Sequence, residues 1–350
     1  MRYFAAFTSG LQDVVRDILV KKVRNVRIVS VLDGAVVFEG LDGIRLPCFN
    51  NLFEVIYTWE NNRKSIDLLM MDMIKYGKGI SCNDKSRSFR VVTSVENRLV
   101  SVNNSVKARM EQRIRQDTRL SLERSGADEE YWFLIRSENM AFFMRRITFH
   151  KPYDKIMRKG ELHPDICYCM AWLAGIKAGD IVLDPFCGYG AIPVCVKNNF
   201  VYGHMYASDK DVGKINYVKG RFKRADKVDV FGCDVFLIQE KVERSSVDVI
   251  ITDPPWGAFD REYSDYYEFY ERVFRQFLMI LRGNAVIVLL TARKQEVERI
   301  CENYRAVLGI RESYNILVSG KKAAVYVIRV EEQTTLATRV QRNAGPSWPG

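Results

Sequence analysis

Two short motifs in the second half of the chain combine aspartates with glycines or prolines in a way that suits chemistry on an amine. The first reads Asp-Pro-Phe-Cys-Gly-Tyr-Gly over 184–190, and the second reads Asp-Pro-Pro-Trp-Gly over 253–257. Glycines allow the backbone to approach a ligand closely. In the second motif the Asp253 carboxylate and the Pro254 carbonyl can both accept hydrogen bonds from one NH₂ group, because the prolines make the turn rigid. The two motifs therefore predict a cofactor loop and an amine-binding turn.

The glycine motif differs from the fingerprint of dinucleotide-binding proteins. Pro193 stands where GxGxxG has its third glycine, and Asp184 precedes the loop. Such an acid would repel a pyrophosphate, whereas it suits the cationic methionine end of S-adenosylmethionine. Asp209 and Asp234 follow the next two strand-like runs, where they would bind the ribose hydroxyls and the adenine amino group. Each aspartate alone could cap a helix, but three after successive strands favour a cofactor site. The expected cofactor-binding residues are Asp184, Pro185, Phe186, Gly188, Gly190, Asp209, Lys210, Asp234 and Val235.

The proline motif supplies the expected catalytic residues, Asp253, Pro254, Pro255 and Trp256. Two acceptors on one amino group draw electron density toward the nitrogen lone pair and hold it in line with a methyl sulfonium. Trp256 would stack on an extruded base, an interaction worth about 1–3 kcal/mol. The same sequence could form only a β-turn with a core tryptophan. Its position after the fourth expected strand, with the glycine loop after the first, favours the catalytic interpretation.

The segments around the motifs alternate between strand and helix. Strands are expected over 181–184, 204–208, 228–232, 247–252 and 284–290, with a helix over 262–281. An antiparallel hairpin follows, with strands over 314–320 and 323–330 and a turn at Lys321 and Lys322. The fold class predicted for this half is α/β, a Rossmann-like class I methyltransferase domain with a mostly parallel seven-stranded sheet. Plain dinucleotide-binding sheets lack the reversed last strand.

The first half of the chain has a different pattern and most of the net charge. A β-α-β-β unit, with a hairpin turn at Asp33 and Gly34, is expected to end near residue 50. A second α+β unit contains a helix over 103–125 with an apolar stripe of Val106, Met110 and Ile114. Its arginines could be an ordinary solvated face or a phosphate-binding one, and the basic surroundings favour the second. The expected RNA-binding residues are Lys107, Arg109, Arg113, Arg115, Arg158 and Lys159, with Arg119 on the same helix.

Charge and cysteine content narrow the class of protein. Of the net charge of +10, residues 1–160 carry +9 (28 Lys and Arg, 19 Asp and Glu) and residues 161–350 carry +1. This uneven distribution favours a protein whose basic first half binds a polyanion and whose nearly neutral second half carries out the chemistry. No apolar run reaches the roughly 18 residues of a membrane helix, and the N-terminal apolar run is too short for a secretory signal. The eight cysteines include no CxxC and only three histidines accompany them, so reduced thiols in the cytoplasm and no metal site are expected.

Several motifs resemble a known family. DPFCGYGAIPV, ASDKD and ITDPPWG are similar to the motifs of amino-methyltransferases that act on N2 of guanine or N6 of adenine in nucleic acid. In the first half, FAAFTSGLQDVVRDIL with GAVVFEG resembles an N-terminal ferredoxin-like domain. The stretch from FRVVTSVENR to MAFFMRRITF resembles a THUMP domain. Over residues 1 to about 330 the chain therefore resembles the THUMP-containing RNA guanine-N2 methyltransferases, the tRNA m²G methyltransferase family.

The resemblance implies transfer of a methyl group from S-adenosylmethionine to N2 of a guanosine in structured RNA, above all the acceptor-stem region of tRNA. A small activator subunit is left open. Tyr189 replaces the usual Ser or Thr between the glycines, and Trp256 stands where the guanine enzymes more often have Tyr or Phe. Adenine N6 as the target, a noncatalytic RNA-binding protein and an NAD oxidoreductase therefore stay as alternatives. The expected parts are a ferredoxin-like domain (1–50), a THUMP domain (51–150), a linker (151–164), the methyltransferase domain (165–331) and a disordered tail (332–350).

Overall fold

The computed structural model describes residues 1–41, 44–96, 98–148, 158, 160–257 and 263–331. The expected tail and most of the expected linker lie outside these residues. Contacts divide the chain into two compact units, Met1–Phe7 with Val15–Ile156, and Thr8–Val14 with Met157–Gly350. We call them the front unit and the rear unit.

The rear unit is a seven-stranded sheet with the order β12-β11-β10-β13-β14-β16-β15. Five neighbouring strands are parallel, whereas β16 runs antiparallel to both β14 and β15. The predicted seven-stranded, mostly parallel sheet is therefore confirmed. The strands are β10 (Ile181–Asp184), β11 (His204–Asp209), β12 (Val228–Gly232), β13 (Val247–Thr252), β14 (Leu281–Thr291), β15 (Leu308–Val318) and β16 (Lys321–Val330).

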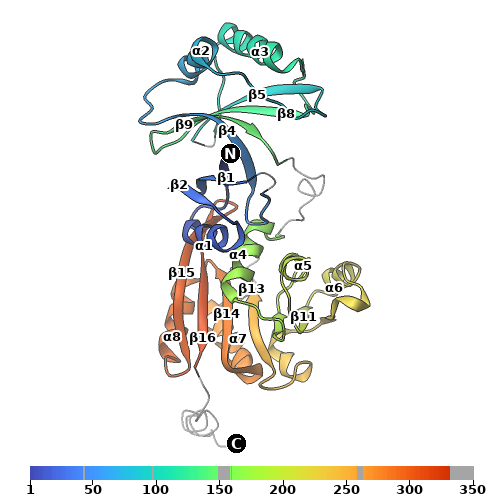
Figure 1. Ribbon diagram of the computed structural model, residues 1–350. Coiled ribbons are helices and arrows are strands. Elements are labelled where there is room, and N and C mark those ends of the chain that lie inside the picture. Colours follow the sequence, from blue (N-terminus) through green and yellow to red (C-terminus); the bar gives the residue numbers. More distant parts are fainter. Residues whose placement is uncertain (42–43, 97, 149–157, 159, 258–262, 332–350) are drawn as a thin grey trace, which may run out of the picture. The chain divides into compact units, whose positions relative to one another are not determined.

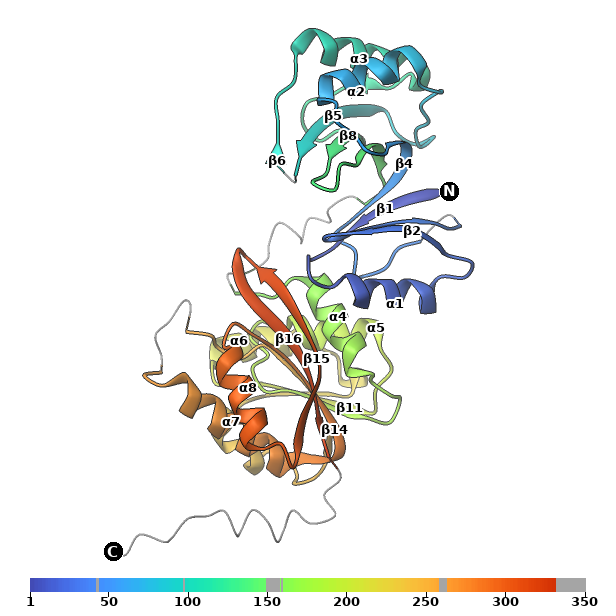
Figure 2. The same ribbon diagram turned by 90° about the vertical axis from the view of Figure 1, so that its left-hand side faces the viewer.

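Helices pack on this sheet and cover it from both sides (Figures 1 and 2). In one group α4 packs against α5, and in the other α7 packs against α8 and the 3₁₀ helix η3. The apolar stripe of α7 is buried from Tyr266 to Ile280, as the helical spacing of the sequence predicts. The helices are α4 (Pro164–Ala174), α5 (Ala191–Asn199), α6 (Val212–Lys219), α7 (Tyr266–Ile280) and α8 (Lys294–Asn303), with η2 (Arg224–Asp226) and η3 (Val235–Glu240).

The terminal hairpin turns two residues earlier than predicted. Lys321 and Lys322 belong to β16, and the turn consists of Ser319 and Gly320. Both turn residues have positive φ angles, +48° and +78°. A two-residue hairpin turn requires such angles, and glycine adopts them without strain.

The front unit contains a single nine-stranded sheet, with the order β2-β3-β1-β4-β9-β8-β5-β6 and β7 beside β5. The boundary predicted after residue 50 falls at the start of β4, which pairs with both β1 and β9, so the two expected domains share one sheet. Helices α2 and α3 lie side by side over the β5 and β8 end of it (Figure 2). The elements are β1 (Arg2–Ala6), α1 (Gln12–Lys22), β2 (Arg27–Leu32), β3 (Ala35–Glu39), β4 (Asn51–Trp59), α2 (Ile66–Tyr76), β5 (Ser88–Val95), β6 (Arg98–Leu99), α3 (Asn104–Thr118), β7 (Ser121–Leu122), β8 (Glu129–Ile135) and β9 (Ala141–Arg146).

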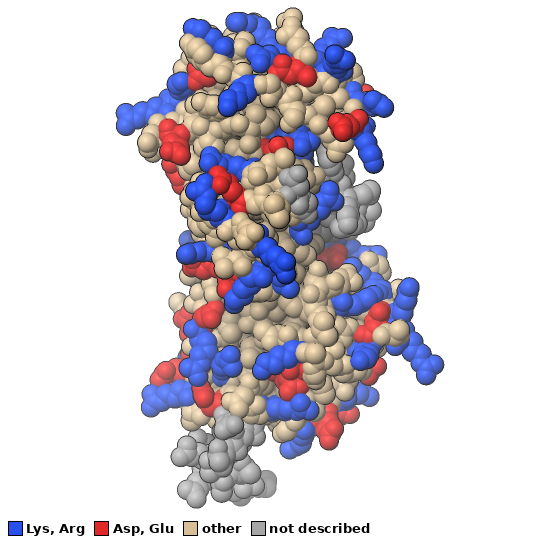
Figure 3. All heavy atoms as spheres, viewed as in Figure 1, with Lys and Arg blue, Asp and Glu red and all other residues tan. Residues whose placement is uncertain are grey.

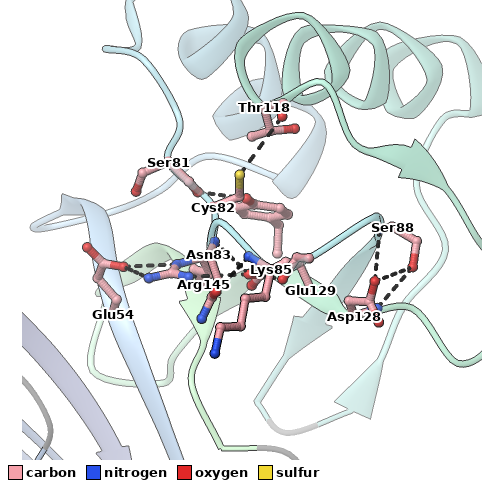
Figure 4. Close-up of polar contacts among 12 residues, drawn as sticks. Glu54, Ser81, Cys82, Asn83, Lys85, Ser88, Thr118, Asp128, Glu129 and Arg145 are labelled. Carbon is pink, nitrogen blue, oxygen red and sulfur yellow. Dashed lines mark hydrogen bonds and ion pairs between the residues drawn. The ribbon is translucent and has the colours of Figure 1, made fainter.

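Asp128 and Glu129, at the start of β8, hold the segment between α2 and β5 onto the sheet of the front unit (Figure 4). Glu129 accepts hydrogen bonds from the Asn83 backbone N–H at 2.9 Å and from Arg145 at 3.3 Å. Arg145 also pairs with Glu54 at 2.6 Å. Asp128 accepts from two backbone N–H groups, those of residues 87 and 88. These contacts fix the segment before β5 to the strands of the front unit.

Candidate functional site

A cavity of about 230 Å³ opens at the carboxyl ends of β10, β11 and β13 in the rear unit. Aspartates from both predicted motifs line it, Asp184 at the end of β10 and Asp253 after β13. These two strands are neighbours in the sheet, since β10 pairs with β13. The fold therefore brings the two motifs to one cavity. The other lining residues are Gly160, Glu161, Leu162, Pro185, Phe186, Cys187, Gly188, Tyr189, Ala191, Ile192, Asp209, Lys210, Lys214, Cys233, Asp234, Val235, Pro255 and Tyr263.

One carboxylate oxygen of Asp184 has hydrogen-bond partners and the other has none within the described residues. Its Oδ1 accepts hydrogen bonds from the Thr252 hydroxyl at 2.9 Å and from the Phe186 N–H at 3.2 Å. Its Oδ2 is buried and has no partner within the described part of the chain. Burial raises the pKa of Asp184 to about 8, against the opposing effect of the Thr252 hydrogen bond. A buried acceptor that lacks a donor is costly unless a ligand satisfies it, so this oxygen suits a cationic ligand.

Asp209 fixes the glycine loop to the end of β11. Its Oδ2 accepts a hydrogen bond from the Gly188 N–H at 2.9 Å, and its Oδ1 accepts one from the Asp211 N–H at the same distance. A carboxylate has about four acceptor positions, so two remain for ribose hydroxyls. The side chain thus holds the loop in place and can still bind a ligand.

The two glycines of the loop have different structural roles, one at the cavity and one at a packing contact. Gly188 lines the cavity with a φ of +52°, and a Cβ there would meet no atom within 4 Å. Gly190, with a φ of +82°, does not line the cavity, and a Cβ there would lie 3.1 Å from Val218 on α6. Gly190 therefore allows α5 and α6 to pack closely, and we no longer propose it as a cofactor contact.

The other expected cofactor residues all line the cavity, among them Lys210, Asp234 and Val235. Asp234 also caps η3, because its Oδ1 accepts a hydrogen bond from the Phe236 N–H at 3.0 Å. The helix-cap interpretation is thus correct for this residue, and it does not conflict with a place at the cavity. Of the nine expected residues, only Gly190 is absent from the lining.

Sequence reasoning missed several lining residues. Glu161 and Leu162 come from the expected linker, which has no periodicity that would predict a place in a wall. Lys214 lies 24 residues after the glycine motif, and Tyr263 follows the proline motif by six residues without belonging to it. Tyr263 stacks on Phe269 of α7 with ring centroids 4.1 Å apart, so α7 holds this aromatic side of the cavity.

The proline motif is divided between the cavity and the protein interior. Asp253 and Pro255 line the cavity, whereas Pro254 and Trp256 do not. Asp253 is partly accessible, but its Oδ1 is sealed and has no partner within the described residues. Burial raises the pKa of Asp253 to about 7, and the indole N–H of Trp256 lowers it somewhat without forming a hydrogen bond of ordinary geometry. The carboxyl group can therefore change its protonation state near neutral pH.

Residues from α7 and the end of β14 hold the backbone of the proline motif. Arg293 donates a hydrogen bond from Nε to the Trp256 carbonyl at 2.7 Å, and its guanidinium lies 4.0 Å from the centroid of the Tyr266 ring. The Tyr270 hydroxyl donates to the Pro255 carbonyl at 3.4 Å. The turn is therefore held by residues that do not line the cavity.

The basic helix α3 is exposed on one face and packed on the other. Met110 and Ile114 are fully buried and Val106 packs against them, so the predicted apolar stripe is confirmed. Arg113 is not free, because it pairs with Asp117 at 3.0 Å and donates to the carbonyls of Ile74 and Gly77. It therefore anchors α3 to the end of α2, and we no longer propose it as a phosphate contact. Lys107 is half-buried, and the exposed cations are Arg109, Arg115 and Arg119.

Arg158 lies in the rear unit, with its guanidinium 4.0 Å from the Tyr217 ring centroid and 4.9 Å from that of Tyr189. Lys159 is outside the described residues. Among the residues that the structure describes, no helix is long and apolar enough to cross a membrane. All eight cysteines are free thiols, and seven are buried.

A known protein family matches most of the rear unit. Residues 152–322 match the family described as UPF0020: RMKL-like, methyltransferase domain. The UPF0020 match begins inside the expected linker, which agrees with the place of Glu161 and Leu162 in the cavity wall.

Two curated relatives are guanine-N2 methyltransferases of RNA. The chain is 28% identical over 180 residues to tRNA (guanine(10)-N2)-dimethyltransferase of Methanothermobacter thermautotrophicus, covering 50% of each protein. It is 30% identical over 137 residues to U6 snRNA (guanine-N(2))-methyltransferase THUMPD2 of Bos taurus, covering 38% of the chain and 26% of that protein. The chain thus spans half or less of the length of these relatives.

A solved structure shows the same fold as the chain. TrmN from Thermus thermophilus superposes with a TM-score of 0.75 at 18% sequence identity, covering 94% of the chain and 99% of TrmN. The predicted fold class, a Rossmann-like and mostly parallel seven-stranded sheet after an α+β front part, is therefore confirmed.

Proposed function

We propose that the chain is an S-adenosylmethionine-dependent RNA methyltransferase that transfers a methyl group to N2 of a guanosine. The observation that carries this proposal is the shared cavity of Asp184 and Asp253, at the carboxyl ends of adjacent parallel strands. One carboxylate faces the cofactor and the other faces the acceptor amine. The names of both curated relatives support guanine N2 over the alternative target, adenine N6.

The residues of the cavity fit the cofactor. The unpartnered Oδ2 of Asp184 would bind the cationic methionine end, Asp209 the ribose hydroxyls and Asp234 the adenine amino group. When bound, S-adenosylmethionine supplies an electrophilic methyl group on a sulfonium. Gly188 leaves room for the ligand, since no atom lies within 4 Å of the place where a side chain would begin.

The proline motif would hold the acceptor amine. Ionised Asp253 would accept a hydrogen bond from the amine, and the Pro254 carbonyl would accept a second one after the same movement that exposes Trp256, since Pro254 does not line the cavity. Asp253 would also take up the proton that the acceptor nitrogen loses on methylation, because the pKa of this carboxyl group lies near 7. Trp256 would stack on the extruded base after a movement that exposes it to the cavity.

The front unit would bind the RNA. Arg109 and Arg115 of α3 and Arg119 at its C-cap are exposed, and the two acids of the helix do not neutralise them, since Glu111 pairs with Arg124 and Asp117 with Arg113. We assign residues 1–50 and 51–150 to the expected ferredoxin-like and THUMP domains, which share one sheet. The two relatives act on tRNA and on U6 snRNA by their names, so both RNAs are substrates to test, tRNA first. We expect a cytoplasmic enzyme, with or without a small activator subunit.

Methyl transfer from labelled S-adenosylmethionine to tRNA and to U6 RNA, followed by mass spectrometry of the nucleosides, tests the proposal. We expect N2-methylguanosine with the wild type, and none with Asp253→Ala at unchanged affinity for RNA and cofactor. Asp229→Ala is the control, because that aspartate is exposed on β12 away from the cavity. N6-methyladenosine as the product would establish the adenine alternative. Absence of cofactor binding would leave a noncatalytic RNA-binding protein.

A further inference from the structure

Positive charge gathers in one segment of the otherwise nearly neutral rear unit. Residues 214–227 contain six lysines and arginines and a single acid, Asp226. The segment consists of α6, η2 and the turns up to β12. Lysine and arginine atoms project from the edge of the rear unit where α6 lies (compare Figures 1 and 3). Such a local excess has an electrostatic effect that the net charge of the unit hides.

The acid of this segment does not neutralise its exposed cations. Asp226 pairs with Lys197 of α5 at 2.9 Å and accepts a hydrogen bond from the Lys223 backbone N–H at 2.6 Å. The side chains of four cations are exposed and form no ion pair with any described residue. We call these four residues the basic ridge: Lys219, Lys223, Arg224 and Lys227.

The fold fixes the basic ridge on a rigid support. Ile215 and Val218 are buried and attach α6 to the sheet beside β11 and β12. Tyr202 donates a hydrogen bond from its hydroxyl to the Asp226 carbonyl at 2.6 Å, which fixes the turn around η2. The cations therefore project from a backbone that is already in place, so less entropy is lost when they bind a ligand.

The basic ridge is connected to the cavity through α6. Lys214, in the first turn of this helix, lines the cavity, and Lys219 ends the helix. The two lysines are five residues apart, about 7.5 Å along the helix axis, which corresponds to about two nucleotides of a duplex strand. Between these ends Tyr217 is 39% exposed and lies against Arg158. A strand whose base enters the cavity therefore has phosphates within reach of the ridge.

We propose that the basic ridge binds the phosphate backbone of the RNA strand that carries the target nucleotide. This inference rests on the proposed function. It adds that the rear unit, and not only the front unit, contacts the RNA. Exposed lysines without partners make sequence-independent contacts with phosphates, because each acts as a point charge. The ridge would fix the position of the RNA while the cavity selects the base.

The test replaces Lys219, Lys223 and Arg224 by alanine and measures the affinity for fluorescent tRNA between 50 and 200 mM salt. Each lost phosphate contact lowers the slope of log affinity against log salt by about 0.9, so three contacts lower it by about 2.7. Over this fourfold salt range the wild type should then lose about 40-fold more affinity than the variant. At saturating RNA the turnover of the variant should be unchanged, with a raised KM.

A second triple variant controls for net charge. Lys241→Ala, Lys322→Ala and Arg329→Ala remove the same charge from exposed positions on β16 and after η3, and the salt slope should stay at the wild-type value. If the wild type binds and methylates RNA but the two triple variants have equal salt slopes, the basic ridge does not bind the phosphate backbone. That result would leave the proposed function intact. A wild type that neither binds nor methylates RNA would overturn both. Unchanged cofactor affinity in the ridge variant shows that the fold is preserved.

Discussion

Binding of S-adenosylmethionine should release protons from Asp184 and Asp253, the two aspartates of the cavity with raised pKa values. Burial raises the pKa of Asp184 from 3.8 to about 8 and that of Asp253 from 3.8 to about 7. At about pH 7 roughly 0.9 of Asp184 and roughly half of Asp253 therefore carry a proton in the free protein. A cation next to Asp184 favours its carboxylate form. We expect release of about one proton per cofactor at about pH 7 and almost none above about pH 9, where both groups are already ionised.

Calorimetry measures this release directly. The binding enthalpy of the cofactor is determined at one pH in phosphate, HEPES and imidazole buffers, and its slope against the ionisation enthalpy of the buffer gives the number of protons. Asp184→Asn should remove most of the effect, whereas Asp229→Asn, at an exposed position on β12, should leave it unchanged. A slope of zero for the wild type at about pH 7 would refute the reasoning. The carboxyl groups would then be ionised in the free protein, or the cationic end would not lie near Asp184.

Two further predictions concern stability and turnover. The raised pKa values of Asp184 and Asp253 mean that their contribution to stability is present below about pH 4 and is lost as pH rises through about 8. Urea unfolding of Asp184→Asn should therefore show a gain of about 3–5 kcal/mol relative to the wild type as pH rises from about 5 to 9, and parallel curves would contradict it. Arg293→Met should lower kcat about 100-fold at unchanged cofactor Kd, because the Trp256 carbonyl loses its donor. Arg282→Met, which removes an exposed ion pair on β14, is its control. Equal kcat values in the two variants would show that Arg293 does not position the turn.

The sequence alone was enough to predict most helices and strands and to find the two motifs. The alternation of strands and helices in the rear unit, the apolar stripe of α3 and the aspartates at successive strand ends all follow from residues close in the sequence. Patterns of this kind are reliable because helices and strands place apolar residues at fixed short periods. The carboxyl ends of parallel strands meet at one edge, so a cavity shared by both motifs could also be expected.

Only the tertiary structure decided which polar side chains are free. Arg113 has the same local sequence signal as Arg109, yet it is occupied by Asp117 and two carbonyls. Gly190 has the same signal as Gly188, yet it faces Val218 instead of the cavity. The orphan oxygen of Asp184 depends likewise on neighbours far along the chain. Local periodicity states which face of an element is buried, whereas partners of single atoms depend on contacts between distant segments, which no short pattern contains.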